Sequence, residues 1–162
     1  MVDLDRSEPP STEAEWHDPG SGLLGPLAWA RILAVESARC KRYGRTATVV
    51  VLEVPTLEDM TAVWGPDVRE IALAKVGKLL ASVARSSDHV ARMGPARFAV
   101  LLPETDEVAA VNFVERARAR CDEGLRSMDA RLRCRFGWAD ARRSRSLDVA
   151  AGVATSRLAS DV

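Results

Sequence analysis

The chain is poor in the residues that mark several specialised classes of protein. Only three of its 162 residues are cysteine, and 5% are aromatic. Because Cys40, Cys121 and Cys134 are odd in number and far apart, they predict neither a disulfide framework nor a Cys-x-x-Cys site, and we interpret them as buried apolar residues. His17 and His89 have no neighbour at metal-ligand spacing, so we expect no metal site and no cofactor.

Net charge and long apolar runs are missing as well. The 23 Lys and Arg equal the 23 Asp and Glu, which argues against a nucleic-acid partner because binding to phosphate backbones needs an excess of cations. No segment approaches the roughly 20 uninterrupted apolar residues of a membrane helix. Residues 1–16 are acidic and turn-forming, which is typical of a disordered lead-in rather than a signal peptide. We therefore expect one cytoplasmic domain over residues 17–160, with no membrane partner.

The first half of that domain shows a strand pattern between two helical ones. Residues 26–42 are rich in helix formers and have Pro26 at their start, which predicts a helix. The β-branched run over residues 46–54 has Glu53 as its only charge, as expected for a central strand covered on both faces. Residues 57–83 show a helical period broken at residues 65–66, which predicts a short helix and then a long one.

The second half continues with a hairpin, a helix, a strand and a last helix. Strands are expected at residues 88–94 and 97–102, joined by a tight turn at 94–96. A helix is expected over 106–121, with its arginines mostly on a solvated face, then a half-exposed strand over 132–138 and a Ser-capped helix over 146–158. This order predicts a single α+β domain with a mostly antiparallel sheet flanked by helices.

Four sequence segments resemble those of a known family. HDPGSGLLGPL, RYGRTATVVVLEV, SSDHVARMGPARFAVLLPET and RFGWA occur in the order and at the separations of the GGDEF family, and the chain resembles these diguanylate cyclase domains over about residues 17–158. The resemblance implies a ferredoxin-like core similar to adenylyl cyclase and polymerase palm domains. It places the family's signature hairpin on Gly94, Pro95, Ala96, Arg97 and Phe98.

The same resemblance implies that catalytic groups of the family are replaced in this chain. The family condenses two GTP molecules to cyclic di-GMP by two-metal chemistry, which needs carboxylates because Mg²⁺ prefers oxygen ligands. Of the metal-binding carboxylates only Glu53 remains, and Arg97 reverses a charge beside the triphosphate site. We therefore expect a degenerate domain that is not an enzyme. The replaced metal and guanine positions are Pro55, Thr61, Ala62, Ala96 and Arg97.

One functional motif of the family is retained. Many members carry an Arg-x-x-Asp product site five residues before the hairpin, and Arg85 and Asp88 stand in that register. Arg can donate two hydrogen bonds to a phosphate or to guanine O6 and N7, while a carboxylate accepts from guanine N1 and N2. The same two residues are also typical of a solvated loop in which Asp88 closes a turn. Arg92 could flank the ligand or be a strand-edge charge.

Three hypotheses for function remain open. The first is a non-catalytic domain that binds cyclic di-GMP through Arg85 and Asp88 and passes the signal to an unidentified signalling protein. The second is an interaction scaffold, in which the fold serves as the surface of a homodimer or of another complex and no nucleotide binds. The third is GTP binding without turnover, with Mg²⁺ held by Glu53 and the backbone alone.

Overall fold

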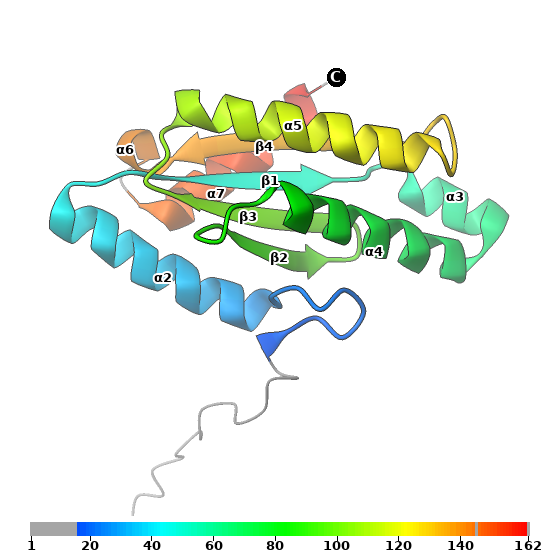
Figure 1. Ribbon diagram of the computed structural model, residues 1–162, viewed down its shortest axis with the longest axis horizontal. Helices are drawn as coiled ribbons and strands as arrows, with labels where there is room; N and C mark the ends of the chain where they lie inside the picture. The colour runs from blue at the N-terminus through cyan, green and yellow to red at the C-terminus, as the bar shows by residue number, and fades with distance from the viewer. Residues whose placement is uncertain (1–15, 145, 162) are drawn as a thin grey trace, which may run out of the picture.

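The centre of the fold is a four-stranded sheet. The structure, a computed structural model, describes residues 16–144 and 146–161, so the lead-in expected over residues 1–16 lies outside the described residues except for Trp16. All strand pairs are antiparallel, in the order β2-β3-β1-β4 (Figure 1), which confirms the expected α+β class. The strands are β1 Ala47–Glu53, β2 His89–Gly94, β3 Arg97–Pro103 and β4 Arg135–Asp140.

Helices cover both faces of the sheet. One face packs against α2 and α7, and the other against α3, α4 and α5, so each face has its own apolar core (Figure 1). Side chains of β1 alternate between the two: Val50 and Leu52 belong to the core under α4 and α5, while Val49 and Val51 belong to the other. The prediction of a central strand covered on both faces is confirmed. The helices are α2 Pro26–Tyr43, α3 Leu57–Trp64, α4 Pro66–Val83, α5 Glu107–Arg126, α6 Ala141–Ser144 and α7 Leu147–Arg157, followed by the 3₁₀ turn η1 Leu158–Ser160.

Local chemistry sets several of the helix ends. The Asp106 carboxylate accepts a hydrogen bond of 2.8 Å from the Ala109 N–H, and the Ser146 hydroxyl accepts one of 3.2 Å from the Val149 N–H. Each bond satisfies a backbone donor that the first helical turn leaves without an intrahelical partner. The predicted Ser cap of the last helix is confirmed. Gly44, with φ of 62°, ends α2 in the left-handed region that glycine adopts without a steric penalty.

Two predicted boundaries are wrong, and both depend on tertiary packing. The helix expected to end at Cys121 continues to Arg126, because Leu125 is fully buried in the core under α4. The strand expected over 132–138 runs instead over 135–140, since the Cys134 N–H donates to the Asp122 carboxylate of α5 at 3.0 Å rather than to a strand. Nor is β4 half exposed: α7 lies against it, and only Arg135 of its residues is exposed.

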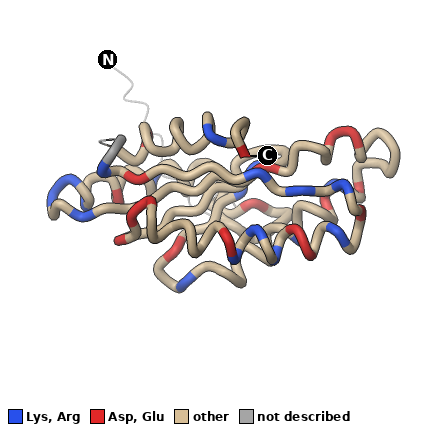
Figure 2. Tube along the Cα trace, turned by 90° about the horizontal axis from the view of Figure 1, so that it is seen from above, with Lys and Arg blue, Asp and Glu red and all other residues tan. Residues whose placement is uncertain are grey.

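The three cysteines are free and buried, as predicted. No helix in the described part of the chain is long and apolar enough to cross a bilayer. Figure 2 shows basic and acidic positions spread along the whole described trace, in keeping with the balanced composition.

Candidate functional site

The β2–β3 hairpin brings the expected catalytic remnant to the end of β1. Arg97 faces Glu53 across the β1–β3 pair, and its guanidinium donates to the Glu53 carboxylate at 3.0 Å. The Ala96 carbonyl accepts a hydrogen bond of 3.1 Å from the Val54 N–H, which fixes the hairpin tip to β1. Phe98 is fully buried and belongs to the core. The six remnant positions, Glu53, Gly94, Pro95, Ala96, Arg97 and Phe98, are thus brought together by pairing of β1 with β3.

These residues do not fit a divalent cation. A Mg²⁺ site needs several oxygen ligands with a net negative charge, and here the carboxylate at the end of β1 is already paired with a cation. Ala96 and Pro55 offer no side-chain oxygen. Nowhere in residues 16–144 and 146–161 do three or more His, Cys, Asp or Glu side chains gather in a way that could hold a metal ion.

Arg92 joins three elements beside the hairpin. Its guanidinium donates to both oxygens of Glu70 on α4 at 3.2 Å and to the Asp18 carboxylate at 3.4 Å, and only 12% of its side chain is exposed. Asp18 also accepts hydrogen bonds from the Ser21 N–H at 2.8 Å and hydroxyl at 2.7 Å. Burial acts to raise the pKa of Asp18, but the bonds from Ser21 and the charge of Arg92 together lower that pKa below its ordinary value. Arg92 is therefore a structural link rather than a free strand-edge charge.

The chain before α2 lies along the free edge of β2. The Leu24 N–H donates to the Val90 carbonyl at 3.2 Å, and the Arg92 N–H donates to the Leu24 carbonyl at 2.9 Å. Together with the Asp18–Arg92 pair, these bonds hold residues 17–25 against the strand that connects the Arg85–Asp88 loop to the hairpin.

Arg85 and Asp88 lie in the loop between α4 and β2 and line a cavity of about 190 Å³. The Asp88 carboxylate accepts a hydrogen bond of 2.7 Å from the Arg85 N–H, and the Asp88 N–H donates to the Arg85 carbonyl at 3.0 Å. The carboxylate therefore does close the turn. Oδ2 of Asp88 is thus occupied by a backbone hydrogen bond. The Arg85 guanidinium makes no hydrogen bond or ion pair with any described residue.

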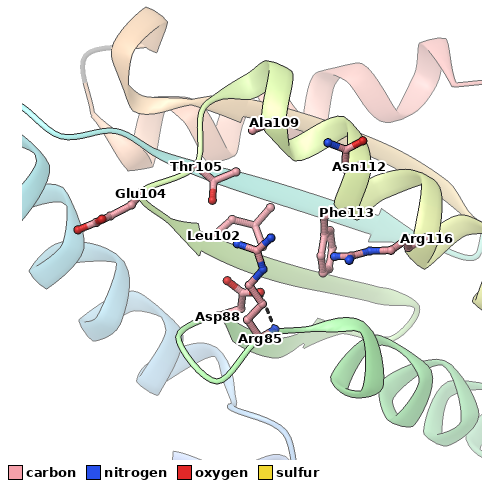
Figure 3. Close-up of a pocket in the computed structure, with 9 residues that line it drawn as sticks. All are labelled: Arg85, Asp88, Leu102, Glu104, Thr105, Ala109, Asn112, Phe113 and Arg116. Carbon is pink, nitrogen blue, oxygen red and sulfur yellow. Dashed lines mark hydrogen bonds between the residues drawn. The ribbon is translucent and has the colours of Figure 1, made fainter.

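Arg116 completes this cavity from the opposite side. Figure 3 shows Arg85 rising from the loop toward Leu102 and Arg116 extending from α5 across Phe113 into the same space, while Glu104 points away. The sequence interpretation missed Arg116, because it assigned the arginines of this helix to a solvated face. The assignment is confirmed for Arg116 and Arg120, which are exposed, but it is wrong for Arg118, which is partly buried and donates to both carboxylate oxygens of Asp161 at 2.9 and 2.8 Å. The inward-facing Phe113, one turn before Arg116, was the available signal.

Comparison with known proteins decides the family. The family model described as "Diguanylate cyclase, GGDEF domain" matches residues 15–153. The chain belongs to the GGDEF family. Among curated members of that family, the chain is 28% identical over 108 residues to the probable diguanylate cyclase DgcC of Escherichia coli K12, covering 67% of this chain and 28% of DgcC. It is 29% identical over 115 residues to the diguanylate cyclase DosC of the same strain, covering 68% of this chain and 25% of DosC. The chain thus spans about a quarter of the length of these relatives.

Solved GGDEF structures share the fold. The GGDEF domain of DgcB from Caulobacter crescentus, crystallised with c-di-GMP, superposes with a TM-score of 0.83 at 19% identity, covering 92% of this chain and 91% of that one. The diguanylate cyclase SiaD of Pseudomonas aeruginosa, crystallised with its activator SiaC, gives a TM-score of 0.76 at 24% identity and covers 91% of this chain and 60% of its own. At these identities the likeness shows the fold alone.

Proposed function

We propose that this chain is a non-catalytic GGDEF domain that binds cyclic di-GMP through Arg85, Asp88 and Arg116. The observation that carries the proposal is the cavity, which is lined by two arginines from different elements and by one aspartate. The c-di-GMP complex of the DgcB domain, which has the same fold, supports this choice of ligand.

The chemistry of the cavity matches the chemistry of the ligand. The guanidinium of Arg85 or Arg116 can donate two parallel hydrogen bonds either to a phosphodiester or to O6 and N7 of guanine. Asp88 uses Oδ2 to accept the Arg85 N–H, and a carboxylate has further acceptor positions with which to receive guanine N1–H and N2–H. Because that backbone bond holds the two residues of the motif at a fixed separation, part of the ordering cost of binding is met before the ligand arrives.

We expect no catalysis because of the residues at the hairpin end of β2, where Arg97 pairs with Glu53. Condensation of two GTP molecules requires metal ions next to the triphosphate, and Arg97 neutralises the carboxylate nearest to that place. Removal of a single group that stabilises transition-state charge costs roughly 10²–10³ in rate. Here several such positions have been replaced, so we expect no measurable synthesis of cyclic di-GMP.

Titration calorimetry with cyclic di-GMP tests the binding proposal. We expect micromolar affinity for the unmodified chain, and a loss of about tenfold or more in Arg85→Ala and in Arg116→Ala, because each removes a charge-assisted fork of hydrogen bonds. Arg126→Ala is the matched control, since Arg126 is exposed on the same helix and does not line the cavity. No binding heat at about 100 μM ligand would contradict the proposal.

The interaction scaffold is a second candidate, and apolar exposure on α3 and α4 favours it. The side chains of Val63, Trp64 and Ile71 are exposed to 69%, 60% and 59%. Large exposed apolar residues are common in contact surfaces between proteins. Such a surface could serve a homodimer or the signalling partner of a ligand-bound domain, so the two candidates differ in whether cyclic di-GMP binds.

A further inference from the structure

Two neighbouring hollows share Arg116 as a lining residue. One is the cavity at Arg85, and the second hollow, of about 450 Å³, is formed by the last turn of α4 and the middle of α5, where Ser82 and Val83 face Arg120 and Glu123. The cavity at Arg85, at about 190 Å³, is smaller than the roughly 300–1,000 Å³ of most small-molecule sites. The second hollow lies within that range, and because Arg116 lines both hollows we refer to the two together as the groove.

Antiparallel packing of α4 on α5 gives this groove its direction. Lys75 Nζ contacts Ser127 Oγ at 2.8 Å, and further along α4 Leu79 lies beside Gly124. The next turn of α4 therefore meets Arg120, and the loop that follows it meets Arg116. Arg116 and Arg120 are one helical turn apart, about 6 Å along the axis.

The far end of the groove repeats the chemistry of the near end. Arg120 is followed three residues later by Glu123, as Arg85 is followed by Asp88, and residues three apart on a helix lie on the same side of it. Both side chains belong to exposed residues. Within the described part of the chain neither makes a hydrogen bond or ion pair, so the guanidinium and the carboxylate are available to a ligand.

We infer that one extended molecule of cyclic di-GMP spans this groove, with one guanine on Arg85 and Asp88, a phosphodiester on Arg116, and the second guanine on Arg120 and Glu123. The inference rests on the proposed function and deepens it. Cyclic di-GMP is symmetric, with two guanines joined through two phosphodiesters, so it presents the same base edge at both ends. The groove offers an Arg–carboxylate pair at each end and a single Arg between them.

Calorimetry of two further variants tests the second guanine subsite. We expect one cyclic di-GMP per chain, and affinity lowered about 5- to 100-fold in Arg120→Ala and in Glu123→Gln. Glu123→Gln should also reduce the preference for cyclic di-GMP over cyclic di-AMP, because an amide can donate as well as accept at the base edge. Arg126→Ala and Glu115→Gln are the matched controls, since both residues are exposed on α5 outside the groove.

The outcomes separate this inference from the proposed function. If Arg85→Ala abolishes binding while Arg120→Ala and Glu123→Gln bind as the unmodified chain does, the second subsite is wrong and the first stands. Two ligands per chain, stacked at the Arg85 end, would also contradict the extended pose. If the unmodified chain shows no binding, both fail. Equal melting temperatures of all variants without ligand exclude misfolding as the cause of lost affinity.

Discussion

Arginine side chains at the two ends of β2 differ in what surrounds them. Arg97, at the hairpin end, donates to the Glu53 carboxylate at 3.0 Å. Arg85, just before the start of the strand, has its guanidinium open to the cavity and only its backbone bonded to Asp88. The two arginines therefore differ in whether a carboxylate already pairs with the guanidinium, and the proposed function uses the unpaired one.

Asp18 provides a pH-dependent test of the link between residues 17–25 and β2. Because its pKa is lowered in the folded chain, ionised Asp18 contributes stability above its ordinary pKa of 3.8, and this contribution is lost as pH falls below that value. We expect Asp18→Asn to reduce the free energy of unfolding by about 1–2 kcal/mol at pH 7. Urea unfolding from pH 7 to pH 3 measures this difference, which should shrink below about pH 4.

Asp59→Asn is the control for this measurement, because Asp59 is exposed on α3. It should change the free energy of unfolding by no more than about 0.5 kcal/mol. A difference between the unmodified chain and Asp18→Asn that stays constant down to pH 3 would show that the charge of Asp18 is not what stabilises the segment.

At the scale of elements, the sequence predicts those helices and strands whose existence depends on a local residue pattern. It does not predict the element ends that depend on tertiary packing. β1 was predictable because its apolar run reflects cover on both faces, and the hairpin because glycine and proline mark its turn. The end of α5 was not predictable, because it depends on burial of Leu125. The start of β4 was not predictable either, because it depends on the hydrogen bond from the Cys134 N–H to the Asp122 carboxylate. In the site, Arg85 and Asp88 are neighbours in sequence, whereas Arg116 joins them only through the packing of α5 beside α4.

The contact between α7 and β4 depends on one glycine. A Cβ added to Gly137 would lie 1.9 Å from the Ala154 carbonyl oxygen, so any side chain there must push α7 away from the sheet. We expect Gly137→Ala to destabilise the fold by about 3 kcal/mol or more, measured by urea unfolding. Gly152→Ala is the control: a Cβ there meets nothing within 4 Å, and Ala in a helix should be neutral or stabilising by up to about 1 kcal/mol. Equal stability of the two variants would contradict this account.

At the scale of the whole molecule, the Arg85–Asp88 loop and the hairpin lie at opposite ends of β2 and are built from different residues. His89 begins the strand next to the Arg85–Asp88 loop, Gly94 ends it at the hairpin, and Leu24 is bonded to its middle. The proposed cyclic di-GMP groove draws on α4 and α5, whereas the catalytic remnant draws on the ends of β1 and β3. In the proposed function, loss of the hairpin carboxylates therefore leaves the groove residues and the contacts that support them intact.

This separation predicts how the intact domain responds to two nucleotides. A ligand that binds only the folded state stabilises it by RT ln(1 + [L]/Kd), which is about 2.7 kcal/mol at 100 times Kd and raises the melting temperature of a domain this size by roughly 5–10 °C. We expect that rise with cyclic di-GMP. GTP with Mg²⁺ should give no rise, because Arg97 holds the Glu53 carboxylate, and chromatography of that mixture should show no cyclic di-GMP. A rise that requires both GTP and Mg²⁺ would instead support GTP binding without turnover. A melting temperature that neither nucleotide moves would leave the interaction scaffold as the function of this fold.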